Sequence, residues 1–393
     1  MSFDATKFRS TTVIIPRENG GGTCQFVLPM RYTVLEFKGG GANGTVVSVR
    51  DSVTNTLMAI KRMQIPLPIL NGDKTAQCLN VKRSYREVAL IASVNHPNII
   101  SFILAFTPQE NLQDFQEIYL VMELMTATLI ELQQTPSILD QKTLSFLLFQ
   151  MLCAVNHMHR MGIIHRDLKS SNIVVDGQCR LKILDFGLAR LTANDNALSM
   201  SGYVVTRWYR APEIILGMGY SEKADVWSIG CIMAELINRQ VLFMGKESLD
   251  QWKKIIEVRG TPNETFIQSL KPTTARYISS LPRETKLAME IVLPEDHFDP
   301  NSGAPGTQQN SAAARDLVDK MLAYEPNERI SVEEALSHPY VKNWRKPDET
   351  NAPLTDNRYD QNIDLEDRSL DEWKELLFNE IKHIEAQRDI FAQ

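Results

Sequence analysis

The sequence has no hydrophobic run long enough to cross a membrane. Its longest apolar stretch, residues 146–155, is interrupted by Gln150, whereas a membrane-spanning helix needs about 20 consecutive apolar residues. The first ten residues, MSFDATKFRS, also lack the apolar centre of a secretory signal. We therefore expect neither membrane insertion nor secretion.

Cysteines are few and widely spaced along the chain. The chain has five cysteines in 393 residues, and no two of them form a C-x-x-C pair. They are Cys24, Cys78, Cys153, Cys179 and Cys231. A disulfide framework or a structural zinc site needs an even or closely spaced set. The pattern instead predicts a reduced, intracellular protein.

Positive charge is not in excess. The 42 Lys and Arg residues face 48 Asp and Glu residues, a net charge of −6. Residues 345–393 hold 7 basic and 13 acidic residues, and 7 − 13 = −6, so this acidic tail accounts for the whole excess. Without a basic field we expect no direct binding of nucleic acid or of an anionic membrane. Hydrophobic and charged residues, at 43% and 23%, are typical of a soluble globular protein.

The chain changes character near residue 126. Before it, apolar runs flank the Gly-rich ENGGG turn in residues 12–28, and residues 56–63 and 118–125 read as strands, with a helical pattern at 82–94 between them. After it, residues 143–159 and 224–237 are apolar nearly all round, as buried helices are. Residues 260–316 are rich in Pro, Ser and Thr and predict a mixed insert or loops. No repeat of 20 to 50 residues is present, which disfavours a solenoid.

A last helix is predicted near the C-terminus. Ser369 and Glu372 form a capping-box pattern. An apolar stripe at spacings of three and four follows, made of Leu370, Trp373, Leu377, Ile381 and Ile384. We expect this helix to dock its stripe on the body of the protein.

A glycine-rich segment suggests phosphate binding. Residues 39–46, GGGANGTV, fit G-x-G-x-x-G-x-V, in which absent side chains let backbone N–H groups approach phosphates. Alone, the segment could equally be a plain turn. Residues 58–61, MAIK, then place Lys61 in a strand where an ammonium group can pair with α and β phosphates, and Glu87 lies on a helix from which it can hold Lys61.

Three further motifs follow in order. Residues 165–172 read HRDLKSSN, residues 185–187 read DFG and residues 211–213 read APE. With these motifs the chain resembles the eukaryotic protein kinases over nearly its whole length. The resemblance implies an α+β, bilobal fold with a small β-rich N-lobe and a larger helical C-lobe, and it implies ATP and Mg²⁺ as cofactors.

The resemblance also assigns catalytic roles and domain limits. Asp167 would accept or orient the substrate hydroxyl, and Lys169 would contact the γ-phosphate that is transferred. Asn172 and Asp185 would hold Mg²⁺. Lys169 is typical of serine/threonine rather than tyrosine kinases. Asp225 resembles the buried aspartate that holds the catalytic loop. The implied regions are an N-terminal hairpin extension (1–30), the N-lobe (31–125), the C-lobe (126–340) with an insert at about 261–315, and a C-terminal extension (341–393).

The resemblance also implies which further residues contact ATP. The base would lie against the hinge formed by residues 123–125, with Met122 limiting the rear of the pocket. The implied ATP-binding residues are Gly39, Gly41, Ala42, Asn43, Gly44, Val46, Ala59, Lys61, Met122, Glu123, Met125 and Val174.

Residues 199–210, SMSGYVVTRWYR, resemble the dual-phosphorylation segment of the MAP kinases. The phosphorylated residues would be Ser201 and Tyr203. A phosphate adds about −1.5 to −2 charges and orders a loop only where cations receive it. The matching arginines are Arg83, Arg86, Arg166 and Arg190 for the first phosphate, and Arg207 and Arg210 for the second.

Several stretches resemble the c-Jun N-terminal kinases, the stress-activated branch. They are KRSYREVALI, GIIHRDLKSSNIVV, EIILGMGY, DQWKKIIEVRGTP and DEWKELLFNEI. The Ser-x-Tyr motif and residues 351–364 further resemble the nematode GLH-binding kinase group. The resemblance implies a monomeric, proline-directed serine/threonine kinase of the cytoplasm and nucleus. It would be activated by a dual-specificity MAP kinase kinase.

The same resemblance implies protein partners. Expected substrates carry Ser-Pro or Thr-Pro sites and basic docking motifs, as bZIP transcription factors do. The narrower group adds a germline RNA helicase. Asp348 and Glu349 are the predicted docking acids.

The chain departs from the family pattern at a few positions. Ser170 replaces the usual proline of the catalytic loop, and Lys38 and Gly40 alter the glycine loop. Thr126 and Thr128 stand near the expected ribose site, and Lys346 replaces a docking acid.

Two alternatives remain open at this point. A pseudokinase scaffold would have no physical need for Lys61, Glu87, Asp167, Asn172 and Asp185. A cyclin-dependent kinase is disfavoured by Tyr203 and by the long C-terminal helix.

Overall fold

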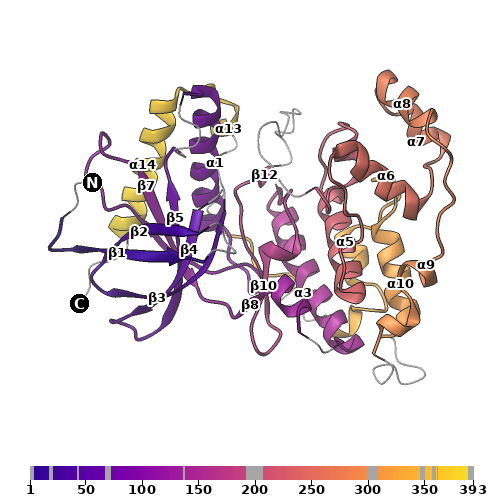
Figure 1. Cartoon of the computed structure of the whole chain (residues 1–393), viewed down its shortest axis with the longest axis horizontal. Coiled ribbons are helices and arrows are strands. Elements are labelled where there is room, and N and C mark those ends of the chain that lie inside the picture. The colour runs from indigo at the N-terminus through magenta and orange to yellow at the C-terminus, as the bar shows by residue number, and fades with distance from the viewer. Residues whose placement is uncertain are drawn as a thin grey trace.

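A computed structural model describes residues 4–16, 21–41, 44–66, 72–135, 138–191, 207–299, 309–345, 350–355, 360 and 362–387. A small lobe built on a β-sheet lies beside a larger lobe of helices (Figure 1). The α+β, bilobal fold predicted from the sequence is confirmed.

The sheet of the small lobe is antiparallel, with its strands in the order β3-β4-β5-β7-β6. They are β3 (Tyr32–Gly41), β4 (Gly44–Asp51), β5 (Leu57–Gln64), β6 (Phe102–Phe106) and β7 (Glu117–Glu123). Strands β5 and β7 lie where the sequence predicts them. Because β5 is central, its residues 58–63 are all buried, Lys61 among them.

One long helix, α1 (Lys74–Ser93), crosses this lobe. It begins eight residues before the predicted segment, because the Asp73 side chain caps it by accepting from the Ala76 N–H at 2.9 Å. Helix α14 (Leu370–Gln387) packs against α1. The apolar pattern is weak in the additional turns because residues 74–80 are exposed or half-buried.

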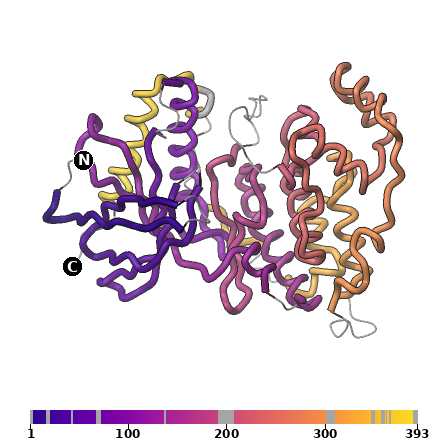
Figure 2. The backbone as a smooth tube through the Cα atoms, in the orientation of Figure 1, coloured from indigo at the N-terminus to yellow at the C-terminus, as the bar shows by residue number. Residues whose placement is uncertain are grey.

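Both chain ends complete the core of the small lobe. The predicted hairpin is β1 (Phe8–Ile15) with β2 (Gly22–Pro29), and the Val27 N–H donates to the Tyr119 hydroxyl of β7 at 2.9 Å. Helix α14, capped by Ser369 and Glu372 as predicted, returns from the large lobe to lie along α1 (Figure 2). Phe26 of the hairpin and Trp373 of α14 are buried in one cluster.

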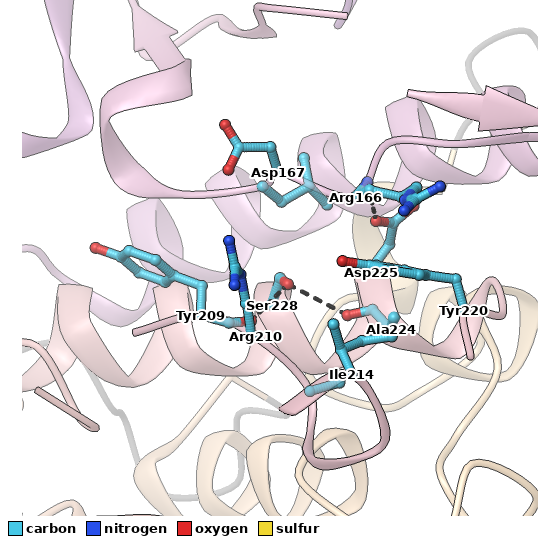
Figure 3. Close-up of a pocket in the computed structure, with 11 residues that line it drawn as sticks. Arg166, Asp167, Tyr209, Arg210, Ile214, Tyr220, Ala224, Asp225 and Ser228 are labelled. Carbon is cyan, nitrogen blue, oxygen red and sulfur yellow. Dashed lines mark hydrogen bonds between the residues drawn. The ribbon is translucent and has the colours of Figure 1, made fainter. Parts of the chain in front are cut away.

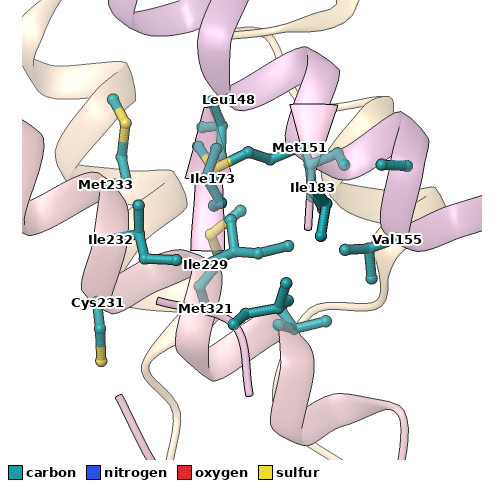
Figure 4. Packing of buried hydrophobic residues seen from close by; sticks show 14 of the residues in the cluster. Leu148, Met151, Val155, Ile173, Ile183, Ile229, Cys231, Ile232, Met233 and Met321 are labelled. Atoms are coloured by element: carbon teal, nitrogen blue, oxygen red, sulfur yellow. The ribbon is translucent and has the colours of Figure 1, made fainter. Parts of the chain in front are cut away.

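The large lobe is built around α3 (Gln141–Arg160) and α5 (Lys223–Asn238), the two helices predicted as buried. Figure 4 shows Leu148, Met151 and Val155 of α3 facing Ile229 of α5, with Met321 of α10 (Ser311–Met321) completing the layer. This packed core fixes the loops that lie between the lobes.

The remaining elements are short. Strands β8 (Ala127–Thr128), β10 (Ile173–Val175) and β11 (Leu181–Ile183) form one small sheet, and β9 (Ile163–Ile164) pairs with β12 (Arg190–Leu191). The other helices are α2 (Leu129–Gln133), α4 (Pro212–Ile215), α6 (Ser248–Arg259), α7 (Glu264–Gln268), α8 (Pro272–Ser279), α9 (Met289–Val292), α11 (Val332–Leu336) and α13 (Asn362–Leu365). The Pro-, Ser- and Thr-rich insert thus contains α7 to α9. No helix in the described ranges is both long and apolar enough to span a bilayer.

Candidate active site

Lys61 and Glu87 connect the sheet to helix α1. The Lys61 Nζ lies 2.5 Å from the Glu87 Oε1, and both side chains are buried. Burial alone would lower the pKa of Lys61, but the carboxylates of Glu87 and Asp185 outweigh it and raise that pKa. Lys61 therefore keeps its positive charge at the position predicted for nucleotide phosphates.

Asp167 lies in the catalytic loop, residues 165–172, between β9 and a 3₁₀ turn, Ser170–Asn172. Its Oδ2 accepts from the Lys169 Nζ at 2.7 Å and from the Asn172 Nδ2 at 3.0 Å. Burial raises the pKa of Asp167, although Lys169 opposes it. A buried carboxylate held between two donors is suited to orient a hydroxyl and to share its proton.

Asp225, at the start of α5, fixes the first half of this loop. Its Oδ2 accepts from the His165 N–H at 2.9 Å and contacts the His159 Nε2 at 2.9 Å, and its Oδ1 accepts from the Arg166 N–H at 2.9 Å. Arg166 has φ = 70°, a left-handed conformation that is costly for a residue with a side chain. The buried carboxylate stabilises that conformation, as the sequence predicts for Asp225.

Asp185 and Asn172 supply oxygen atoms near Lys61. The Leu184 N–H donates to the Asn172 carbonyl at 2.8 Å, so Asp185 directly follows a residue bonded to Asn172. Burial would raise the pKa of Asp185, but Lys61 and the Gly187 N–H outweigh it and lower that pKa.

The amide oxygen of Asn172 is available for a cation. Both protons of its Nδ2 point to Asp167, one to Oδ2 at 3.0 Å and one to the carbonyl at 2.9 Å, so only Oδ1 remains. An ionised carboxylate and an amide oxygen are ligands that Mg²⁺ prefers. These two residues therefore fit a magnesium ion.

The glycine loop joins β3 to β4. Gly44 has φ = 130°, and a Cβ built there would lie 2.3 Å from the Arg62 carbonyl oxygen, so only glycine fits. At Gly39 and Gly41 an added Cβ would meet no atom within 4 Å, which leaves the backbone open to a ligand. Lys38 pairs with the exposed Glu36 at 2.5 Å.

The residues predicted to line the base pocket come from several elements. Val46 of β4 is paired in register with Lys61, and Ala59 is paired with Met122 of β7. Met122 packs against the cores of both lobes. Val174 of β10 in the large lobe is buried, and Met125 of the hinge is half-buried.

The side chain of Glu123 anchors the hinge. Its Oε1 pairs with the Lys182 Nζ of β11 at 2.7 Å and accepts from the Ser101 N–H at 2.6 Å. Thr128, near the expected ribose site, instead caps α2 by accepting from the Glu131 N–H at 3.2 Å. Lys182 was missed by sequence reasoning, because nothing local ties β11 to the hinge.

Three of the predicted phosphate-binding arginines lie together. Burial lowers the pKa of Arg210, and the neighbouring charges of Arg207 and Arg166 lower it further. The Arg166 guanidinium carbon lies 3.7 Å from the centre of the Tyr220 ring. The remaining three lie on two other elements: Arg83 and Arg86 on α1, where Arg86 is buried, and Arg190 on β12.

Six predicted site residues lie outside the described ranges. They are Ala42, Asn43, Ser201, Tyr203, Asp348 and Glu349. Their assignments remain predictions.

A pocket opens beside Asp167. Figure 3 shows Asp167 and Arg166 along one side and Tyr209, Arg210 and Ile214 along the other. Leu168 and Ala211 also line it. The pocket thus combines a few apolar side chains with two arginines directly next to the predicted catalytic carboxylate.

Ser170 has partners that the sequence did not predict. Its hydroxyl donates to the Glu235 Oε2 of α5 at 2.5 Å, and the Tyr209 hydroxyl donates to the same oxygen at 2.8 Å. The only sequence signal was an acidic residue, Glu235, within an apolar helical pattern.

A family model described as "Protein kinase domain" matches residues 32–341. The chain belongs to the protein kinase family. The predicted family is confirmed, and protein kinases in general use ATP and Mg²⁺.

Curated relatives narrow the kinase type. The kinase is 50% identical over 390 residues to GLH-binding kinase 1 of Caenorhabditis elegans, across 99% of this chain and 97% of that protein. It is 46% identical over 365 residues to stress-activated protein kinase JNK of Drosophila melanogaster, across 93% and 94%. It is 46% identical over 371 residues to stress-activated protein kinase jnk-1 of C. elegans, across 94% and 77%. The kinase is a serine/threonine MAP kinase of the JNK type, as predicted.

Proposed function

We propose that this kinase transfers phosphate from Mg·ATP to serine or threonine residues that precede a proline. The observation that carries the proposal is the pocket beside Asp167, where Leu168, Ala211 and Ile214 can make apolar contacts with a proline. A substrate with its hydroxyl at Asp167 would place the following residue in this pocket.

Each residue of the site has a part in this transfer. When bound, Mg·ATP supplies the phosphoryl group and a cation that neutralises charge developing on it. Lys61, held by Glu87, binds α and β phosphate oxygens. Asp185 and Asn172 hold the metal through oxygen atoms. Asp167 orients the substrate hydroxyl and takes its proton, while Lys169 stabilises the negative charge.

Regulation is proposed to use Ser201 and Tyr203. A dual-specificity MAP kinase kinase phosphorylates both, and arginines receive the phosphates. The cluster of Arg166, Arg207 and Arg210 supports this proposal, because like charges are brought together there at a cost that an anion would relieve. Ser201→Ala and Tyr203→Phe should each lower activity strongly.

Partners and location are proposed from the family resemblance. We propose basic docking peptides that bind Asp348 and Glu349, substrates such as bZIP transcription factors, and action in cytoplasm and nucleus. The name of the C. elegans relative, GLH-binding kinase 1, supports a germline RNA helicase as a further partner.

A pair of peptides tests the proposal. We expect a Ser-Pro peptide to be labelled and its Ser-Ala twin not to be, and only after an activated MAP kinase kinase has modified Ser201 and Tyr203. Equal labelling of both peptides would contradict proline direction. No labelling although ATP binds and both sites are modified would favour the scaffold alternative, and activation by a cyclin without loop phosphorylation would favour the cyclin-dependent one.

A further inference from the structure

The second half of the catalytic loop has its own anchor. Ser170 is fully buried, and its hydroxyl donates to the Glu235 Oε2 at 2.5 Å across a sequence separation of 65 residues. It directly follows Lys169 and begins the turn that ends at Asn172. The Asn172 N–H donates to the Lys169 carbonyl at 2.9 Å and closes that turn. Ser170 therefore sits between the two residues that hydrogen-bond to the Asp167 carboxylate.

Glu235 depends on hydroxyl donors. It is 3% exposed, and none of the described Lys, Arg or His side chains lies within ion-pair distance of its carboxyl group. Burial raises its pKa, and the bonds from Ser170 and Tyr209, together with the nearby Gln133 side chain, oppose that rise. A buried carboxylate with few donors loses much when one is removed, because nothing else replaces the lost hydrogen bond.

Glu235 is also bonded to a residue that lines the pocket beside Asp167. Tyr209, which lines the pocket, donates its hydroxyl to the same Oε2 at 2.8 Å. The Tyr209 carbonyl accepts from the Ser228 hydroxyl of α5 at 2.8 Å. One carboxylate oxygen thus joins the catalytic loop to a wall of the pocket through the rigid helix α5.

The two anchors on α5 divide the loop between them. Asp225 holds the backbone at residues 165 and 166, and Glu235 holds the side chain of Ser170. Asp167 lies between these two points. Without the second anchor, Lys169 would be held, among the described residues, only by its bonds to Asp167 and Asn172. Asn172 would be held outside this turn by Asp167 and by the Leu184 N–H.

We propose that Ser170 is a positioning residue for phosphate transfer, acting through the hydrogen bond that its buried hydroxyl donates to Glu235, which Tyr209 shares. The proposal rests on the proposed function, since it takes Asp167 as the group that orients the hydroxyl. Ser170 touches neither nucleotide nor substrate; it holds Lys169 and Asn172 so that the Asp167 carboxylate keeps its direction.

The test compares Ser170→Ala with Ser170→Thr and with Ser171→Ala. Ser171 is the exposed neighbour in the same turn and is the matched control. Each full-length variant is activated by the upstream kinase, and kcat and KM are measured for ATP and for a Ser-Pro peptide. Casein is used as a second substrate, so that transfer can be followed even if the preference for proline is absent. The melting temperature is recorded for each variant.

We expect Ser170→Ala to lower kcat about tenfold, with both KM values within about twofold of wild type, because a hydrogen bond to a charged group is lost. Ser170→Thr should recover most of kcat, and Ser171→Ala should behave as wild type. In a Glu235→Gln background, Ser170→Ala should lower kcat much less than it does alone.

Several results would overturn the proposal. They are an unchanged kcat in Ser170→Ala, equal losses in both alanine variants, or a loss in Ser170→Ala that Ser170→Thr does not recover. An equal loss in the Glu235→Gln background would also overturn it. Failure of the proposed function looks different: wild type would label casein without preferring Ser-Pro, while the ratio between Ser170→Ala and wild type on casein would still test Ser170.

Discussion

In the small lobe one ion pair joins two separate elements, whereas in the large lobe the catalytic loop is bonded to a single buried helix. Lys61 and Glu87 meet between β5 and α1, and α1 is in turn covered by α14 from the far end of the chain. Asp225 and Glu235 both lie on α5, which is buried along nearly its whole length.

The two arrangements have different energetic consequences. A buried ion pair loses hydration that its attraction barely repays, so it positions groups more than it stabilises the fold. The carboxylate of Asp225 accepts from two backbone N–H groups of the catalytic loop, and the loss of these hydrogen bonds is costly. Neutral substitutions of Lys61 and Glu87 in the small lobe should therefore leave the protein folded. Substitution of Asp225 in the large lobe should destabilise it.

The largest expected effect comes from the large lobe. Asp225→Ala removes the carboxylate that accepts from the N–H groups of His165 and Arg166, at about 1–3 kcal/mol for each lost bond. We expect phosphate transfer to fall about a thousandfold, as for loss of a catalytic constellation, and the melting temperature to fall as well. Kinetics and thermal unfolding of the variant check both. Glu290→Ala, an exposed acid of the same lobe, is the control; a stable but inactive Asp225→Ala would contradict the contrast between lobes.

Lys61→Met should lower transfer about a hundredfold through loss of phosphate stabilisation. In the double variant Lys61→Met/Glu87→Gln both buried side chains are uncharged, so no unpaired charge remains in the core. This variant should melt within a few degrees of wild type. Steady-state kinetics and calorimetry give the two values. The exposed Lys74→Met serves as control, and a collapse of stability in the double variant would show that the pair is structural first.

Trp373→Ala removes a main contact between helix α14 and helix α1. Trp373 is buried beside Tyr85 of α1, with ring centres 5.9 Å apart, and loss of a buried tryptophan costs about 3–5 kcal/mol. We expect a lower unfolding free energy but less than tenfold loss of transfer, because the Lys61–Glu87 pair can re-form. Chemical denaturation and kinetics measure the two effects. Glu375→Ala, at an exposed position of the same helix, should change neither the unfolding free energy nor the rate of transfer. Equal losses in both variants would contradict the specific role of Trp373.

The smallest effect on the rate is expected at His157, which is buried in α3 without hydrogen bonds to either ring nitrogen among the described residues. Burial lowers its pKa from 6.5 to about 4, and the nearby His96 contributes. The unfolded chain binds this proton below about pH 6.5 and the folded chain does not, so stability falls as pH drops from about 6.5 towards 4. His157→Leu should flatten that slope and leave activity at pH 7 unchanged, as unfolding curves at several pH values would show. The same slope in both proteins would exclude His157 as its source.

The sequence predicts the parts of the site whose residues are close together in the chain. The catalytic-loop motif keeps Asp167, Lys169 and Asn172 within six positions, and the strand around Lys61 has a clear apolar pattern. Bonds across many residues leave no such spacing. Neither the pairing of Ser170 with Glu235 nor that of Glu123 with Lys182 could be predicted, because each depends on how distant elements pack.

The same limit applies to the fold. The stripe on α14 predicts that the helix docks, but only the packed structure places it on α1 in the small lobe. The start of α1 could not be predicted either, because residues 74–80 are exposed or half-buried and carry little apolar pattern.

The most direct test of the account is Asp167→Asn, measured for both nucleotide binding and phosphate transfer. Asparagine keeps the shape of the side chain but cannot take a proton, and Lys61, Asp185 and Asn172 remain to bind Mg·ATP. We predict that calorimetry gives an affinity for Mg·ATP within a few-fold of wild type while transfer to the Ser-Pro peptide falls at least about a thousandfold. Transfer at the wild-type rate by this variant would contradict the assignment of Asp167 and with it the mechanism.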